Sequence, residues 1–336
     1  MHAKEKRTGI LLAVTAAVLW GVSGTFAQFL FESRSVGPEW LVSVRMPAAG
    51  LLMLLIFGRR GGPPGTIMAP WRHRGDAMRL ILFSLLGMLA IQYTYFAAIR
   101  HSNAATATVL QFAGPVIIAV WLTLTRRRWP APGTCAAILL AVAGTVLLVT
   151  HGRLDTLAVS PQALGWGLAS AVALAWCSIQ PVALLARHST SVITGWAMIV
   201  GGTAFWLVHP PWRLTGVWDA PALGAMLFIL VPGTLLPFNF YMSAIRLAGG
   251  QTASLLLSAE PLSATLTGVL WLKTPFGPMD WLGSACILAA VFFLPGPETA
   301  HAAGTTGGMV TEDGGENHPG AGYPREASSS SSSQSP

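Results

Sequence analysis

The sequence predicts an all-α polytopic membrane protein, with ten transmembrane helices arranged as two inverted five-helix repeats. Three observations lead to this fold class. Only 10% of the 336 residues are charged and 53% are hydrophobic, whereas a soluble domain carries about a quarter charged residues. The chain divides almost wholly into apolar runs of membrane length. Two long segments are also alike, at a constant spacing along the chain.

The apolar runs set the predicted helices, because about 20 apolar residues are needed to cross a bilayer. Ten runs approach or meet this length, and the seventh is the shortest. They cover residues 9–30, 39–58, 78–98, 103–125, 131–150, 161–183, 193–209, 221–245, 249–272 and 278–295. The links between them leave no room for a soluble catalytic domain.

The runs group into two repeats followed by a tail. We expect residues 1–150 to form the first five-helix repeat and residues 151–295 the second. Residues 296–336 are rich in Gly, Ser, Pro and acidic residues and end in a serine tract. Such a composition cannot bury enough apolar surface to fold, which predicts a disordered cytoplasmic tail.

The net charge of +7 indicates orientation rather than a nucleic-acid partner. With the N-terminus inside, eleven Lys and Arg residues of the first half fall on the inner side and three on the outer side; the second half is balanced. Positive residues favour the cytoplasmic side of a membrane. We therefore expect a multi-pass protein of the cell (inner) membrane, in contact with lipid, with both termini in the cytoplasm.

The internal repeat aligns residues 87–144 with residues 233–290 without a gap, and 14 of the 58 positions are identical. Five predicted spans separate equivalent points, so the second copy enters the membrane from the opposite side. Inverted repeats of this kind build alternating-access transporters, which bind substrate at the midplane between the halves. The alternative is that duplication is only an economical way to build a bundle.

Glu260 and Pro261 lie near the middle of the ninth predicted span. A carboxylate at membrane depth costs about 2.5–3.5 kcal/mol on insertion scales, so it should face a wet cavity or a partner. Pro261 removes the hydrogen bond to the carbonyl of Leu257 and should kink the helix. Glu260 is thus a candidate contact for a substrate amine, a proton site, or both; alternatively it pairs structurally, for example with Arg45.

The repeat places Gly114 and Pro115 opposite Glu260 and Pro261. Gln111 lies three residues before Gly114, on the same helical face, and Pro115 should free its carbonyl. One half would then offer an amide and a carbonyl, and the other a carboxylate. Pro115 and Pro261 are the candidate hinges. Small residues on the face of Glu260, such as Ser263 and Thr267, either line a cavity or pack closely against another helix.

Arg45 lies about 9–10 Å into the second span, at 1.5 Å rise per residue. It either extends outward to the interface, anchors a substrate carboxylate, or pairs with Glu260. Tyr93 and Asn239 occupy paired positions of the repeat and either line the cavity or belong to an interfacial belt.

Trp20 and Trp176 fall mid-span in the first helix of each half, where they either stack on a substrate or pack in the core. Gln180 precedes Pro181 in a further polar kink. The substrate-binding candidates are Glu260, Gln111, Arg45, Trp20, Tyr93, Asn239, Trp176 and Gln180.

Four passages, taken in order, resemble the EamA-type carriers of the drug/metabolite transporter superfamily. They are Leu19-Trp20-Gly21-Val22-Ser23, Val44-Arg45, the segment from Tyr95 to Pro115, and the segment from Tyr241 to Pro261. The resemblance covers about residues 9–295. It implies ten helices around a central cavity, and transport, often export, of small metabolites such as amino acids, driven by an ion gradient or by exchange. Arg126 to Trp129 and Lys273 stand where that family often has a Gly-Glu pair.

Two functions are consistent with these features. The first is a secondary active transporter that exports small metabolites, such as amino acids or related amines and carboxylates, with protons as a candidate coupling ion. The alternative is a multidrug or quaternary-ammonium exporter, in which Trp20, Trp176, Tyr93 and Glu260 would cage a cation. A membrane enzyme or scaffold ranks last, because no motif supports catalysis, and neither a metal nor a cofactor is expected.

Overall fold

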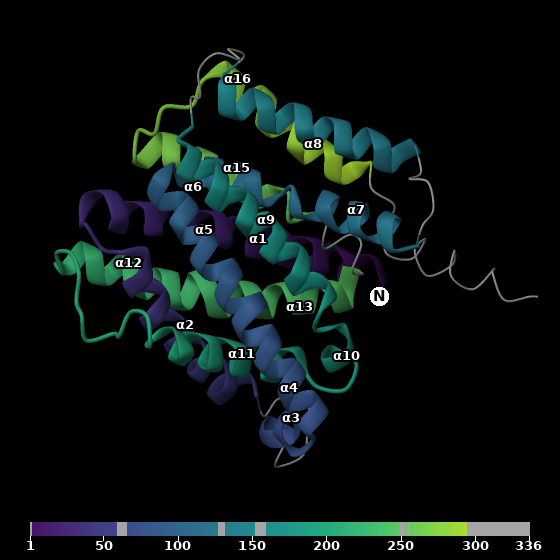
Figure 1. The fold of residues 1–336 in the computed structure, drawn as a ribbon, viewed down its shortest axis with the longest axis vertical. Coiled ribbons are helices and arrows are strands. Elements are labelled where there is room, and N and C mark those ends of the chain that lie inside the picture. The colour runs from purple at the N-terminus through teal and green to yellow at the C-terminus, as the bar shows by residue number, and fades with distance from the viewer. Residues whose placement is uncertain are drawn as a thin grey trace, which may run out of the picture. The chain divides into compact units, whose positions relative to one another are not determined.

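The computed structural model describes residues 2–58, 66–126, 132–151, 159–248, 253 and 256–293. These residues belong to one compact unit, which extends over residues 1–296. The parts of the chain described are helical or form turns, and they contain no strand (Figure 1). The predicted tail, residues 296–336, lies outside the described residues.

Prolines and polar caps begin several of the helices. Pro38 opens α2 and Pro161 opens α9, where the missing N–H costs nothing. Ser160, Ser189 and Asp219 each accept a backbone N–H at a helix start. The helices of the first half are α1 (His2–Ser33), α2 (Pro38–Phe57), α3 (Ala69–Arg72), α4 (Arg74–Leu82), η2 (Phe83–Leu89), α5 (Ala90–His101), α6 (Ala104–Gln111), α7 (Gly114–Arg126) and α8 (Pro132–Thr150), with a 3-10 turn, η1 (Thr66–Met68), before α3.

The second half follows the same plan. Its helices are α9 (Pro161–Ile179), α10 (Val182–Leu185), α11 (Thr190–Phe205), α12 (Ala220–Leu230), η3 (Val231–Leu235), α13 (Leu236–Ala248), α15 (Ala259–Trp271) and α16 (Pro278–Phe292). Among the described residues, six helical stretches are long and apolar enough to cross a membrane, and two shorter apolar helices, Pro132–Leu148 and Thr190–Phe205, accompany them. The all-helical membrane class is therefore confirmed, and ten spans remain a prediction.

The helix bounds repeat along the chain with the spacing of 146 found in the sequence. The π-helical segment η3 aligns with the last five residues of η2, and α13 aligns with α5. In both copies a two-residue turn precedes the half-helix that carries the proline, at residues 112–113 and, one position earlier in the alignment, at residues 257–258. Similar sequences thus give the same irregularities, and π-helical segments are frequent at functional sites.

The two halves exchange helices rather than fold side by side. Helix α1 packs against α13 and α15 of the second half, and α9 packs against α5, α6 and α7 of the first. Two further extensive contacts join equivalent helices, α2 with α11 and α8 with α16 (Figure 1). At the centre of the α8–α16 pair, a Cβ atom at Gly144 would lie 2.6 Å from the carbonyl of Gly283, and one at Gly283 would lie 2.7 Å from that of Gly144. Only glycine allows this reciprocal approach.

Helices α2 and α11 run antiparallel. The start of α2 meets the end of α11, where the Trp206 indole donates to the carbonyl of Ser43 at 2.8 Å. Towards the other end, a Cβ atom at Gly195 would lie 2.7 Å from the side chain of Leu54. The pair therefore has two distinct ends, and candidate residues can be assigned to one or the other.

Candidate functional site

Glu260 is the second residue of α15, directly after the turn at Leu257 and Ser258. Its side chain is half-buried, and Pro261 is buried beside it. The prediction of a free Leu257 carbonyl is wrong, because that oxygen accepts the backbone N–H of Glu260 at 2.9 Å. The chain tightens into a three-residue turn before Pro261 and so satisfies the acceptor that proline leaves behind.

The carboxylate of Glu260 has no hydrogen bond or ion pair with any other residue that the structure describes. Its own backbone is held firmly. The Ser263 hydroxyl donates to the Glu260 carbonyl at 2.9 Å, and Gly21 of α1 lies against the same carbonyl. The backbone that carries this carboxyl group is thus held at the start of a half-helix, and the carboxyl oxygens have no hydrogen-bond partner among the described residues.

The small and hydroxyl residues on this face of α15 pack against α1. The Ser263 hydroxyl also lies 3.3 Å from the carbonyl of Val18, and Thr25 and Thr267 share a hydrogen bond of 2.7 Å. Of the two interpretations, close helix packing is therefore the one observed for Ser263 and Thr267. Such small-residue contacts are typical of helix interfaces in membranes.

Arg45 is buried within the helices, with 6% of its surface exposed. Its Nε and Nη2 donate to the hydroxyl of Thr234 at 3.1 and 2.9 Å, and Nη1 donates to the amide oxygen of Gln92 at 3.3 Å. Its guanidinium carbon lies 5.0 Å from the centre of the Phe96 ring. Two of the three alternatives for Arg45 are therefore wrong: it does not extend outward, and it does not pair with Glu260.

Tyr95 is a further polar residue near both Arg45 and Glu260. Its hydroxyl shares a hydrogen bond of 2.8 Å with Thr108 and is within electrostatic range of both Glu260 and Arg45. Sequence reasoning identified Tyr95 as part of the repeat and did not select it for the site. The signal was present, since Tyr95 and Tyr241 are identical at paired positions. Thr234 was missed as well, because nothing local marks it as a partner of Arg45.

Gln111 is buried, but its amide points to α9 and donates to the Ser170 hydroxyl at 2.6 Å. Trp20 packs edge-on against Phe238 and Tyr241, with ring centres 5.3 and 5.8 Å apart. Within the described part of the chain, neither residue hydrogen-bonds to the Glu260 carboxylate. Pro115 is the second residue of α7, directly after the turn at residues 112–113, so both predicted hinge prolines lie at helix breaks.

Trp176 and Gln180 lie towards the end of α9. Trp176 is 43% exposed and lines a shallow, apolar hollow with Leu86 and Val172. The Gln180 amide nitrogen donates to the carbonyl of Arg79 at 3.0 Å, while its buried oxygen has no hydrogen-bond partner among the described residues. The rings of Trp20, Trp176 and Tyr93 make no contact with one another in the described part of the chain.

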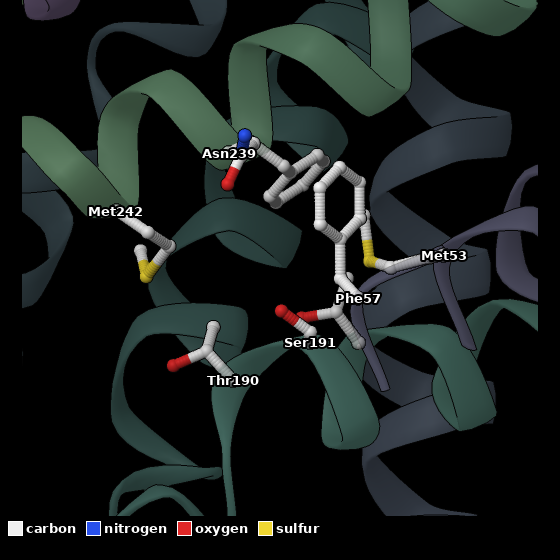
Figure 2. Close-up of a pocket in the computed structure, with 8 residues that line it drawn as sticks. Met53, Phe57, Thr190, Ser191, Asn239 and Met242 are labelled. Carbon is white, nitrogen blue, oxygen red and sulfur yellow. The ribbon is translucent and has the colours of Figure 1, made fainter. Parts of the chain in front are cut away.

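Tyr93 and Asn239 occupy paired positions but meet opposite ends of the α2–α11 pair. The Tyr93 hydroxyl donates to Glu39 at 3.2 Å, and its ring packs against Trp166 and Phe205 at 5.5 and 5.3 Å. Asn239 instead lines a pocket of about 20 Å³ (Figure 2). This volume holds about one water molecule.

Figure 2 shows Asn239 directed into this pocket from α13, opposite side chains from the end of α2 and the start of α11. The lining residues are Met53, Phe57, Thr190, Ser191, Thr194, Phe238, Asn239 and Met242. We call the line along which α2 and α11 meet the seam. It is filled by the Tyr93 ring at one end and borders the pocket at the other. This difference could not be seen in the aligned sequences, which pair Tyr93 with Asn239.

A family model described as the EamA-like transporter family matches the chain twice, over residues 7–150 and 162–295. The chain belongs to the EamA-like transporter family. The resemblance seen in the sequence is thereby confirmed. This EamA-like protein is accordingly a multi-pass membrane transporter.

Among its relatives, the Salmonella typhimurium protein named "Uncharacterized inner membrane transporter YicL" is 39% identical over 291 residues, which is 86% of this chain and 95% of that protein. The Bacillus subtilis "Uncharacterized transporter YwfM" is 27% identical over 84% of this chain and 92% of its own. The Escherichia coli "Threonine/homoserine exporter RhtA" is 26% identical over 84% and 88%. A crystal structure with a TM-score of 0.57 and 21% identity covers 86% of this EamA-like chain and 96% of its own, and it shows the fold alone.

Proposed function

We propose that this EamA-like protein is a secondary active transporter that exports small metabolites, amino acids or related amines and carboxylates, by alternating access. The observation that carries the proposal is the exchange of helices between two halves that share their helix breaks. Transporters with inverted repeats use such broken helices to build a site at the midplane. The name of RhtA, an exporter of threonine and homoserine, supports the amino-acid class.

The proposed topology has ten spans, with residues 1–150 and 151–295 as the two repeats and both termini in the cytoplasm. The end where α2 begins and α11 finishes is then external, and the end where α11 begins is cytoplasmic. The pocket at Asn239 belongs to the cytoplasmic side of the seam, and the Tyr93 ring belongs to the external side.

We assign the central role to Glu260, because a carboxylate without a described partner at membrane depth is costly unless it binds something. It would bind the amine of the substrate and exchange a proton as the coupling ion. Pro115 and Pro261 would serve as hinges, since each begins a half-helix. Gln111, held by Ser170, would position α6 against α9.

The test is counterflow of radiolabelled amino acids in proteoliposomes. Glu260→Gln should abolish counterflow or remove its dependence on pH, and Glu260→Asp should retain part of it. Glu5→Gln, at the exposed start of α1, is the matched control and should transport like the wild type. Wild-type rates and an unchanged pH profile in Glu260→Gln would exclude Glu260 from the mechanism.

A further inference from the structure

Arg45 is a buried cation that has only neutral acceptors. Its two described hydrogen-bond partners are the Thr234 hydroxyl and the Gln92 amide, and no described carboxylate pairs with it. A buried charge without a counter-charge is strongly unfavourable. In a membrane protein such a residue generally faces an ion or substrate pathway. An anion from outside the chain would satisfy it.

The unused N–H donors of the Arg45 guanidinium indicate which kind of anion would bind there. Arginine has five N–H donors, and three of them are used, two by Thr234 and one by Gln92. One N–H on each terminal nitrogen is left without a described acceptor. Two parallel donors match the two oxygens of a carboxylate. The Phe96 ring, 5.0 Å from the guanidinium carbon, covers one side and limits rotation.

The position of Arg45 also connects the subsite to both halves and to Glu260. Thr234 belongs to η3 of the second half and Gln92 to α5 of the first, so an anion bound here would contact a residue held by both. Tyr95 is within electrostatic range of Arg45 and of Glu260. The guanidinium and a carboxyl group thus both lie near one tyrosine, which suits a molecule that carries both charges.

We propose that Arg45, held by Thr234 and Gln92, binds the carboxylate of the transported molecule, while Glu260 binds its amine. The substrate is then a zwitterionic amino acid rather than a simple amine or a lipophilic cation. This inference rests on the proposed transport function and deepens it. It makes the carboxylate, and not only the amine, a requirement for binding.

The binding test uses thermal unfolding of the purified full chain in detergent, with a panel of amino acids, their methyl esters, acetate and chloride. A ligand that binds the folded state raises the unfolding temperature. We expect at least one amino acid to bind about tenfold or more tightly than its ester, as loss of charged hydrogen bonds implies. Arg45→Gln should bind both equally. Arg213→Gln, an exposed loop arginine, is the matched control and should retain the preference.

Arg45→Lys serves if the glutamine variant does not fold, because it keeps the charge and loses the paired donors. Wild-type protein that binds acid and ester equally, or an Arg45→Gln or Arg45→Lys variant that still prefers the acid, would overturn the inference. A shift with chloride or acetate as large as with amino acids would show a free anion site and overturn it too. Counterflow separates the proposals: transport without acid preference refutes the subsite, and acid preference without counterflow refutes transport.

A different observation, at the ends of the α2–α11 pair, carries a second inference. At one end Arg34 binds Asp219 through two bonds of 2.9 and 3.0 Å. Trp40 packs against Trp218 at 4.5 Å, and its indole donates to the carbonyl of Pro211 at 2.9 Å. We call this set, Arg34, Trp40, Trp218 and Asp219, the first latch.

The other end repeats these parts. Asp76 binds Arg187 at 3.2 Å and His188 at 3.0 Å. Trp196 packs against Trp71 at 5.4 Å, and its indole donates to the carbonyl of Ile67 at 2.7 Å. The second latch consists of Trp71, Asp76, Arg187, His188 and Trp196.

The first latch joins the chain from the end of α1 to the start of α2 with the segment before α12. The second latch joins the chain from the end of α10 to the start of α11 with helices α3 and α4, which precede η2 and α5. The two latches therefore connect equivalent parts of opposite halves. Both are closed in this structure. We infer that the latches are the two gates of the alternating cycle, and that opening one requires the other to remain closed. The common contacts are an aspartate with an arginine, and a tryptophan pair whose indole bonds to the opposite loop.

Hydrogen exchange of the full chain in lipid nanodiscs tests the reciprocity. Asp219→Asn should raise exchange at residues 206–219 and lower it at residues 66–76, because the second latch is then closed for more of the time. Asp76→Asn should do the reverse. Combining Arg34→Asp with Asp219→Arg restores an ion pair, although it removes the cap that Asp219 gives α12, and should return exchange at residues 66–76 to the wild-type level. Two variants that each raise exchange only at their own latch would show ordinary structural ion pairs and overturn the inference.

Discussion

Gly21 of α1 lies directly against the backbone of Glu260 in α15. A Cβ atom at position 21 would overlap the Glu260 carbonyl and the Ser263 hydroxyl, and it would lie 2.8 Å from the amide of Ala264. The absence of a side chain at Gly21 therefore sets how closely α1 approaches the half-helix that carries the candidate carboxylate. The contact couples the first half of the chain to the second at the centre of the proposed site.

We expect Gly21→Ala to be destabilising by about 1–3 kcal/mol, the usual cost of overpacking a close contact. The backbone of α15 would have to move, so transport should fall as well. Gly165→Ala is the matched control, because nothing lies within 4 Å of a Cβ atom at that helical position. Unfolding of both variants in mixed detergent micelles measures the difference. Equal stability of the two would contradict the close approach.

The Gln111–Ser170 hydrogen bond predicts that a second substitution restores stability lost by the first. Ser170→Ala leaves the buried Gln111 amide without its described acceptor, at a cost of about 1–3 kcal/mol. Adding Gln111→Leu removes the polar group, and leucine is the residue at the paired position 257. The double variant should therefore be more stable than Ser170→Ala alone, as measured by thermal unfolding. A double variant that is less stable would show that Gln111 has a further partner.

Under the proposed topology, Tyr93 should control the external side of the α2–α11 seam. Tyr93→Phe keeps the ring against Trp166 and Phe205 but loses the hydrogen bond to Glu39, which is worth about 0.5–1.5 kcal/mol. We expect faster labelling of an engineered cysteine near this end by a membrane-impermeant reagent. Tyr241→Phe is the control, because its ring packs on Trp20 and its hydroxyl has no hydrogen bond to a described residue. Equal labelling in both variants would show that packing of the Tyr93 ring, and not its hydrogen bond to Glu39, closes this end of the α2–α11 pair.

The Arg34–Asp219 pair predicts a defined pH dependence. The hydrogen bond from Arg34, and then the backbone N–H of Ala222, lower the pKa of Asp219 below its ordinary value. A lowered pKa in the folded state stabilises the protein above the unfolded pKa, about 3.9, and this stabilisation is lost as the pH falls through the lower folded value. Asp219→Asn should lower the unfolding temperature equally at pH 5 and pH 8. The difference from the wild type should begin to shrink below about pH 4 and vanish only below the lowered folded-state pKa of Asp219.

A difference that instead changed between pH 5 and pH 8 would show that another titrating group controls this end of the molecule. The pair is partly exposed, with 24% of the Arg34 side chain and 40% of the Asp219 side chain accessible. Salt should therefore weaken the effect. Repeating the comparison at high ionic strength tests that expectation.

Several features followed from the sequence because they depend on local chemistry. Apolar runs of membrane length required helices, and the gapless repeat carried similar helix bounds, since similar segments fold alike. Pro115 and Pro261 marked the helix breaks, because proline has no N–H to continue the hydrogen-bond ladder. Glu260 stood out because a carboxylate is costly at membrane depth. These properties do not depend on which helices become neighbours.

The partners of these residues depended on the tertiary structure. Arg45 binds Thr234, which lies 189 positions away, and no local pattern specifies such a pair. Trp176 points outward although its mid-span position resembles that of Trp20, because position along a helix does not determine which face meets another helix. Tyr93 and Asn239 align in the repeat, yet the former fills its end of the seam and the latter lines a pocket. Their different surroundings, contributed by opposite ends of α2 and α11, decide which of the two equivalent sites is filled.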